Sequence, residues 1–298
     1  MEMGLISDMV NFPNIAQMKI SAYHKQKGDN VEIVTTFFKH YDICYTSKVF
    51  NLDLPTIPNL LYRPVADKYI EGGSGYCIEI ENGKEVYHTE NDKPLPDEIE
   101  HICPDYSLYP QFKDTAYRFL TRGCPNNCPF CVVSKKEGLC SRKVADLSEF
   151  WNGQSLIKLC DPNLLACKDR EKLLCQTKIT MIHFAFDLMK NEDRILKGLK
   201  TFAKYCDKGE REKRIYILTN YNTTLQEDYY RVKRIKELGY SPYITIYRKG
   251  THPQFLTDLQ RWSNNMFLQR ATTFEDYIPR KDGKPCKELY REILNKTS

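Results

Sequence analysis

The stretch RFLTRGCPNNCPFCVVSKKEGLCSR, residues 118–142, decides how the rest of the chain is interpreted. It places Cys124, Cys128 and Cys131 in a C-x3-C-x2-C array immediately after residues 116–120, an apolar run with the composition of a β-strand. A strand that ends in this loop would deliver three thiols to one place. Such close and fixed spacing of cysteines indicates a metal centre.

Three clustered thiolates limit the kinds of metal centre. Iron–sulfur clusters usually take four cysteines, so three would leave one iron of a 4Fe-4S cluster without a protein ligand. The loop composition suits this arrangement, because Gly123 permits an unusual turn while Pro125 and Pro129 disfavour a helix. Phe130, just before the third cysteine, would offer an apolar surface beside the cluster.

Two alternatives remain open for the same thiols. Structural zinc closes tetrahedrally on four ligands, so Cys140 could complete a zinc site with the three cysteines of the array. The thiols could also be unliganded. The chain has 12 cysteines, and most of those outside the array are expected to be small buried side chains.

The array, with an aromatic residue just before its last cysteine, resembles that of the radical S-adenosylmethionine (SAM) superfamily. The resemblance implies that Cys124, Cys128 and Cys131 bind a 4Fe-4S cluster and that Phe130 lies on the adenine side of bound SAM. It also implies that the open iron chelates SAM, and that reductive cleavage yields methionine and a 5′-deoxyadenosyl radical. The electron would come from a donor such as flavodoxin or ferredoxin, and the substrate is unknown.

Further segments look like an uncharacterised radical SAM group found in bacteria and their phages, and the matches span roughly residues 11–277. The resemblance implies a radical SAM partial (β/α) barrel over 116–277, preceded by a domain over 1–80 that is similar to a shrunken cobalamin-binding domain. Residues 81–115 would connect the two, and 278–298 would form a charged tail. The matching segments include TRGCPNNCPFCVVSKKEG, SRKVADLSEFW, DPNLLA and LTNYNTT.

Composition places few limits on function. The 298 residues, 41% of them hydrophobic, suffice for one large or two modest domains. Acidic and basic residues are interleaved and the formal net charge is only +5, so nucleic-acid binding is not indicated. No apolar run is long enough for a membrane span, and residues 1–14 lack the regions of a signal peptide. We therefore expect a cytoplasmic protein with reduced cysteines.

Residues 1–80 predict a small Rossmann-like α/β domain with a parallel sheet. Asn11 is the expected N-cap of its helix and Gly28 the expected end. His24 is expected at the helix surface, because the D-x-H-x-x-G motif of a cobalt ligand is absent. The glycines of 72–75 favour a structural turn, because no Gly-Lys-Ser/Thr follows to make a phosphate loop. Strands are expected over 4–6, 31–35 and 43–47, and a helix over 13–27.

From residue 116 onward, strands alternate with helices, which predicts βαβ units and a parallel sheet or partial barrel. The basic run 231–236 carries apolar residues at core spacing, so its charges are expected on a solvated face. The tail predicts one short helix. Strands are expected over 116–120, 156–160, 179–186, 214–218 and 243–247, and helices over 168–176, 192–206, 225–238 and 253–268, with another beginning at 147.

Polar residues follow several of these strands. Asp161 and Asn163 follow one strand, and Asp187 and Asn220 end two others. Because α/β folds place ligand contacts at the carboxyl ends of parallel strands, all four are candidates for the SAM or substrate pocket. Asp-Pro and Asn are also common turn formers, which is the alternative role for the first pair. His183, within a strand, could equally be a core histidine.

The number of predicted strands differs from that of a radical SAM barrel. A radical SAM barrel has six strands, whereas the sequence predicts five from residue 116 onward, and residues 173–178 join their flanks directly where a further strand and helix would be expected. We therefore expect an α/β fold with a barrel shortened by one β/α unit. Cluster binding is better supported than SAM cleavage. The alternative function is a non-catalytic iron–sulfur or zinc-binding protein with a degenerate radical SAM fold.

Overall fold

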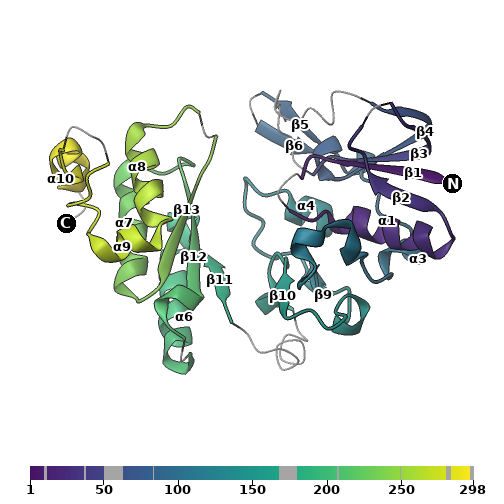
Figure 1. Ribbon diagram of the computed structural model, residues 1–298. Helices are drawn as coiled ribbons and strands as arrows, with labels where there is room; N and C mark the ends of the chain where they lie inside the picture. The colour runs from purple at the N-terminus through teal and green to yellow at the C-terminus, as the bar shows by residue number, and fades with distance from the viewer. Residues whose placement is uncertain are drawn as a thin grey trace. The chain divides into compact units, whose positions relative to one another are not determined.

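The chain forms two compact units, Met1–Thr177 (unit 1) and Lys178–Ser298 (unit 2), in a computed structural model (Figure 1). Both units are α/β with parallel sheets, which confirms the general fold class. The domain boundaries predicted after residues 80, 115 and 277 do not coincide with this division and stay predictions. The structure describes residues 1–9, 12–36, 38–49, 63–82, 84–167, 180–206, 208–248, 250–279 and 283–295.

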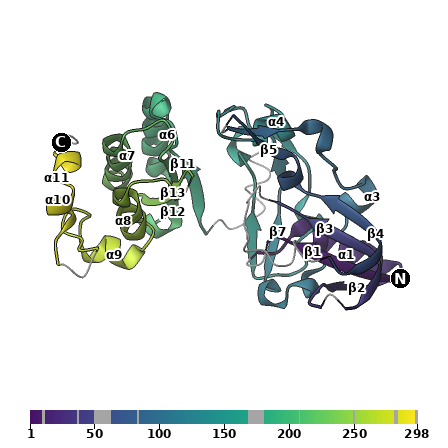
Figure 2. The same ribbon diagram turned by 90° about the horizontal axis from the view of Figure 1, so that it is seen from above.

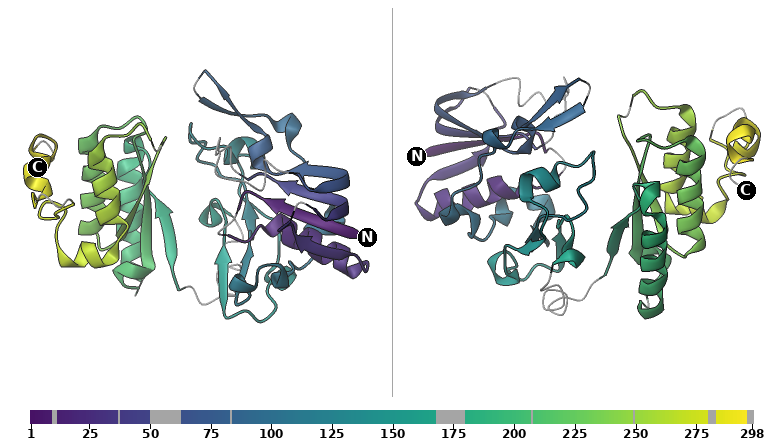
Figure 3. Two further views of the ribbon diagram at one scale, coloured as in Figure 1. Left: turned by 45° about the horizontal axis from the view of Figure 1, so that its top comes forward. Right: turned by 180° about the vertical axis from the view of Figure 1, so that it is seen from behind.

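A four-stranded parallel sheet begins unit 1 (Figure 3). Its strand order is β2-β1-β3-β4, and helix α1 (Ile15–Gln26) joins β1 to β2. Met3, Leu5 and Ile20 share a core with Ile99 of α3 (Asp97–Glu100), so the polar segment expected to connect two domains packs on this sheet. The strands are β1 (Glu2–Ser7), β2 (Asn30–Ile33), β3 (His40–Ser47) and β4 (Val65–Gly72).

Helix α1 begins later than predicted. Its N-cap is Asn14, whose side-chain oxygen accepts a hydrogen bond from the Gln17 amide at 3.1 Å, so the predicted cap at Asn11 was wrong. The predicted end is confirmed, because Gly28 follows the C-cap with a φ of +83°, the left-handed conformation that glycine adopts most readily.

His24 of α1 was expected at the surface, and this prediction was wrong. The residue is only 5% exposed. Its Nδ1 lies 2.7 Å from a carboxylate oxygen of Asp29, and its Nε2 lies 2.8 Å from the hydroxyl of Tyr45 in β3. The ring is buried because the last turn of the helix packs on the sheet, where both ring nitrogens have partners.

Residues 72–75 form the predicted structural turn. Gly73 has a φ of +108°, and a Cβ atom there would lie 2.3 Å from the carbonyl oxygen of Lys48, so the position requires glycine. The Gly75 amide donates to the same carbonyl at 2.8 Å. The segment continues with η1 (Ser74–Tyr76), the antiparallel hairpin of β5 (Ile78–Glu81) and β6 (Lys84–Tyr87), and η2 (Thr89–Asn91).

Two short sheets complete unit 1 and frame the cysteine loop. β7 pairs with β10 in parallel, and β8 pairs with β9 antiparallel, around a small core that contains Ala116, Leu120 and Phe150. The helix expected from residue 147 is a single 3-10 turn, and the helix expected over 168–176 lies outside the described residues. The elements are η3 (Tyr106–Leu108), η4 (Pro110–Phe112), β7 (Thr115–Arg118), β8 (Thr121–Arg122), α4 (Val133–Glu137), β9 (Arg142–Lys143), η5 (Leu147–Glu149), β10 (Leu156–Leu159) and η6 (Leu164–Ala166).

Unit 2 contains a parallel sheet of order β11-β12-β13, with α7 and α8 on one face (Figure 2). Along β12, buried and half-buried residues alternate, so Ile215 and Ile217 face the helices, where they pack with Val232 and Leu256. The elements are β11 (Ile182–Ala185), η7 (Met189–Asn191), α6 (Glu192–Tyr205), η8 (Glu210–Glu212), β12 (Lys213–Thr219), α7 (Leu225–Glu237), β13 (Ser241–Ile246), α8 (Gln254–Ser263), α9 (Met266–Ala271), α10 (Cys286–Leu289) and α11 (Arg291–Leu294).

Two predictions in unit 2 were wrong in detail. The helix predicted over 253–268 is broken after Ser263, and Asn265 caps a second helix by accepting hydrogen bonds from two backbone amides. Arg231, expected on a solvated face, is 0% exposed, because its guanidinium bonds to backbone carbonyls at the strand ends. None of the helices within the described residues is long and apolar enough to cross a membrane.

Candidate metal centre on the cysteine loop

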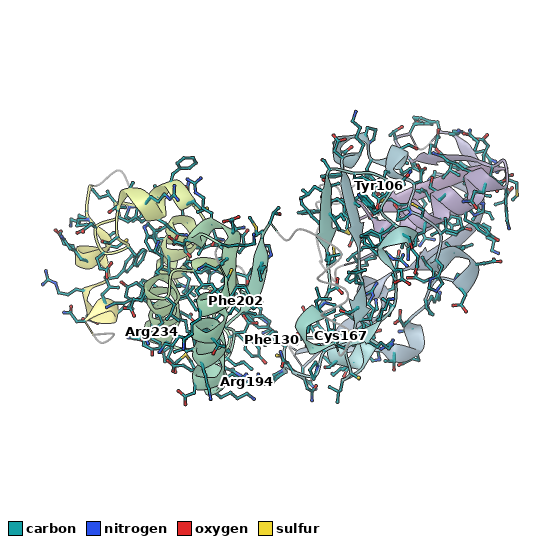
Figure 4. All side chains as sticks on the ribbon, turned by 90° about the horizontal axis from the view of Figure 1, so that it is seen from below. Tyr106, Phe130, Cys167, Arg194, Phe202 and Arg234 are labelled. Carbon is teal, nitrogen blue, oxygen red and sulfur yellow. The ribbon has the colours of Figure 1, made fainter. Side chains whose placement is uncertain are left out.

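The three cysteines of the array lie on one loop that follows β8. The side chains of Cys124, Cys128 and Cys131 are each half-buried. The Cys131 amide donates to the Cys128 carbonyl at 3.0 Å, which folds the segment between them into a tight turn. Phe130, within that turn, is half-buried and is labelled in Figure 4. The loop thus presents three thiols and an aromatic ring together on a short stretch of backbone.

A carboxylate that the sequence did not single out closes the base of this loop. One oxygen of Glu137 accepts from the Arg122 guanidinium at 2.5 Å, and the other accepts from the Gly123 amide at 2.9 Å. The Glu137 side chain is only 9% exposed. The Cys124 amide also donates to the Gly138 carbonyl at 3.1 Å. The two ends of the loop are therefore held together at both the side-chain and backbone levels.

Gly123 is required at this junction. Its φ is +91°, and a Cβ atom there would lie 2.2 Å from the carbonyl oxygen of Cys140. The close approach brings the backbone of Cys140, an exposed free thiol, against the start of the cysteine loop. A fourth cysteine is therefore part of the same local structure, although it lies outside the C-x3-C-x2-C array.

Asp161, a predicted site residue, fastens the end of β10 to the segment that leads into the loop. Its Oδ1 accepts from the amide and the hydroxyl of Thr121, the latter at 2.6 Å, and its Oδ2 accepts from the Leu120 amide at 3.2 Å. Burial raises the pKa of this carboxyl, while its hydrogen bonds oppose that shift. Both oxygens are engaged, so the observed role of Asp161 is to position the strand that precedes the cysteines.

Asn163, two residues further on, reaches the array itself. Its Nδ2 atom donates to the sulfur of Cys124 at 3.6 Å. Its backbone carbonyl accepts from the Ser141 hydroxyl at 3.0 Å and from the Ala166 amide at 3.2 Å. Asn163 is therefore a strand-end residue, predicted from the sequence, that contacts a cysteine of the array.

The other two predicted site residues lie in unit 2. Asp187 Oδ1 accepts from the Leu218 amide at 2.9 Å, and burial raises the pKa of its carboxyl. Asn220 has a φ of +63°, and its side chain donates to the Tyr247 carbonyl at 2.9 Å. Each therefore joins the end of one strand to the next within the sheet.

Arg231 organises the same end of that sheet, a role that the sequence interpretation missed. Its guanidinium donates to the carbonyls of Phe186, Asp187 and Leu218 at 2.7, 3.0 and 2.9 Å and pairs with Asp228 at 2.5 Å. A signal was present in the sequence, because residues 228, 231 and 235 lie on one face of α7, which places the arginine beside a core isoleucine.

His183 lies on the exposed face of β11, so the alternative of a core histidine was wrong. Its ring contacts Tyr216 edge-on, with centroids 5.2 Å apart, and burial lowers the pKa of the imidazole, as does the nearby Arg214. Tyr216 in turn contacts Tyr243 edge-on at 5.2 Å. His183 is thus one end of a row of aromatic rings across the three strands, and its observed contacts are those of packing.

A separate group of charged residues lies on the β5–β6 hairpin. Atoms of Glu79, Glu81 and His88 that could bind a metal lie within 4.8 Å of one another. The two glutamates are largely exposed, and a hydrogen bond to Glu90 raises the pKa of His88. The raised pKa favours the charged imidazole, which pairs with these carboxylates, so ion pairing is sufficient to explain the group.

Comparison with known proteins adds no relative. The chain matches no family model, no curated protein and no solved structure.

Proposed function

We propose that this chain is a radical SAM enzyme of unknown substrate, in which Cys124, Cys128 and Cys131 hold a 4Fe-4S cluster and SAM binds at the remaining iron. The observation that carries the proposal is the closed cysteine loop: three half-buried cysteine side chains on one loop whose ends are tied by Glu137. The cluster, when bound, supplies the electron that cleaves SAM to methionine and a 5′-deoxyadenosyl radical.

The surrounding residues suit such a group. Thiolates bound to iron carry negative charge, and the Asn163 amide donates to the sulfur of Cys124. Asp161 fixes the strand that precedes the loop, and Phe130 supplies a half-buried apolar ring next to the third cysteine. The chain would thus hold the cluster, orient SAM and limit access of water, while the cofactors supply the chemistry.

The fold is compatible with the proposal at a coarse level. Parallel strands alternate with helices in unit 2, and β7 and β10 are parallel in a separate sheet of unit 1. The shortened radical SAM barrel expected over residues 116–277 stays part of this proposal. Asp187 and Asn220, at strand ends, stay candidate contacts to SAM or substrate within this proposal.

A structural zinc site is the second candidate, because the backbone of Cys140 packs against Gly123 at the start of the loop. The two candidates differ in the number of cysteines they need. Under the cluster proposal, C128A loses the metal centre and C140A keeps it. Under the zinc alternative, C140A also loses its metal, because four ligands are required.

The deciding experiment is anaerobic purification and reconstitution of the wild type, C128A and C140A, with iron, sulfide and zinc measured per chain. Iron and sulfide in wild type and C140A, but not in C128A, support the cluster. Zinc in the wild type that is lost in both variants contradicts it.

Catalysis is tested next, with dithionite in place of the flavodoxin or ferredoxin donor. We expect 5′-deoxyadenosine from SAM with the wild type and none with C128A. A reconstituted cluster with no SAM binding in a titration would contradict the SAM enzyme and leave a non-catalytic iron–sulfur protein.

A further inference from the structure

Asn163 occupies a position where the side chain ordinarily forms hydrogen bonds with the nearby backbone. It is the N-cap residue of η6, and an asparagine in that position typically accepts hydrogen bonds from the first backbone amides of the turn. Here the side chain makes no such bond. Its amide instead donates to the Cys124 sulfur, 39 residues earlier in the chain. Turn formation therefore does not explain the direction of this side chain.

The backbone on which the amide is carried is firmly held. The Asn163 carbonyl accepts two hydrogen bonds, one from the hydroxyl of Ser141, which is 7% exposed, and one from the Ala166 amide. Two residues earlier, Asp161 fastens the strand end to Leu120 and Thr121. The donor and the sulfur are thus positioned by the same small framework, which limits how far either can move away from the other.

A hydrogen bond to a ligating sulfur changes the redox properties of an iron–sulfur cluster. The donor withdraws charge from the thiolate, and this stabilises the reduced cluster, which carries more negative charge, relative to the oxidised one. The reduction potential rises as a result. The effect depends on an N–H donor directed at the sulfur, and the shape of the side chain alone does not produce it.

We infer that Asn163 is a positioning residue that raises the reduction potential of the cluster by donating an N–H···S hydrogen bond to Cys124. The inference rests on the proposed function, because it requires Cys124 to be a cluster ligand. It goes beyond that function by identifying which side chain outside the cysteine loop regulates the ease of the first electron transfer.

The test is an EPR-monitored redox titration of the reconstituted full chain without SAM, so that only the cluster and its surroundings are measured. N163L has a similar shape and no donor, and its midpoint potential should be lower than that of the wild type. N163D replaces the donor with a charged acceptor and should be lower still. N163Q keeps an amide donor and should lie between wild type and N163L. The matched control is N152L, at an exposed asparagine outside the cysteine loop, and its potential should equal the wild-type value.

The outcomes separate the inference from the proposed function. A wild-type chain that holds no cluster contradicts the proposed function itself. A cluster in N163L with the wild-type potential overturns the inference and leaves the function standing. If N163L holds no cluster, the other two variants decide: a higher potential in N163Q than in N163D supports the inference, and equal potentials overturn it.

Discussion

The strand ends of the two units carry the same pair of residue types but use them differently. Asp161 and Asn163 follow β10 in unit 1, and Asp187 and Asn220 end β11 and β12 in unit 2. Both aspartates accept backbone amides of a neighbouring segment, so both fasten strands. The asparagines differ, because one donates to a backbone carbonyl and the other to the thiol of Cys124. A polar residue at a strand end can therefore either join two strands or contact the cysteine loop, and its bonding partner shows which role it has.

The largest loss of stability is expected when Arg231, which joins the strand ends in unit 2, is replaced. Arg231 and Asp228 are both fully buried, so R231M would leave the carboxylate without its charged partner and free three strand-end carbonyls. We expect it to lower the free energy of unfolding by about 3–5 kcal/mol. The measurement is urea unfolding followed by fluorescence of Trp262, a core residue of unit 2, with the exposed Trp151 replaced by Phe.

The matched control for this prediction lies on the same helix. Arg234 pairs with Glu237 at 2.5 Å, but the two side chains are 33% and 44% exposed. R234M should therefore leave the free energy of unfolding close to that of the wild type. Equal losses in R231M and R234M would show that the buried network does not hold the sheet end together.

A second, smaller effect is expected at the strand end in unit 1. In D161N one carboxylate oxygen becomes an NH2 group that faces a backbone or hydroxyl donor, so at least one hydrogen bond to Leu120 or Thr121 is lost. We expect a loss of about 1.5–3 kcal/mol in the free energy of unfolding, as for bonds to a charged group. Iron content after reconstitution should also fall, because the affected segment leads into the cysteine loop. D114N, at an exposed aspartate before β7, should change neither quantity.

Much of the fold could be predicted because it depends on local patterns. The strand predicted over 214–218 is observed at Lys213–Thr219, and the helix predicted over 225–238 at Leu225–Glu237. In both, the hydrophobic period indicates which face is buried. The cysteine array likewise needs only local spacing to be recognised. Where the prediction depended on one cap, as at Asn11, a competing asparagine three residues later was used instead.

The predictions that were wrong share a different cause. They concern side chains whose partners include residues far away in the sequence. His24 was placed at the surface because no cobalt-ligand motif surrounds it, and Arg231 because other residues of its helix have core spacing. Each is nevertheless buried against groups that other segments supply. The same limit applies to the candidate site. Sequence could place Asp161 and Asn163 at a strand end, but only the folded chain shows that one reaches Thr121 and the other Cys124.

Asn220 is expected to contribute to stability through its bond to a backbone carbonyl. N220G loses the bond to the Tyr247 carbonyl, which should cost about 0.5–1.5 kcal/mol. N220A loses the same bond and also places a Cβ atom at a φ of +63°, so it should cost about 1 kcal/mol more than N220G. Urea unfolding measures both. Weaker SAM binding in a stable N220G would contradict a purely structural role for Asn220, because it would give this asparagine a ligand role as well.

The smallest effect is expected for D187N. Burial raises the pKa of Asp187 above its ordinary value of 3.8, although the Leu218 amide and the Arg231 charge oppose the shift. Between 3.8 and that raised pKa the folded chain binds more protons than the unfolded chain, so the contribution of Asp187 to stability falls as pH rises through this range. Asparagine keeps an acceptor for the one Leu218 amide and carries no charge. We therefore expect D187N to change the free energy of unfolding at neutral pH by less than about 1 kcal/mol and to flatten its pH dependence in that acid range. Unfolding curves at several pH values measure both.

A loss of stability in D187N as large as that in D161N would contradict this prediction. It would mean that the number of hydrogen bonds each carboxylate accepts does not govern its contribution to stability, since Asp161 accepts three and Asp187 accepts one in the described structure.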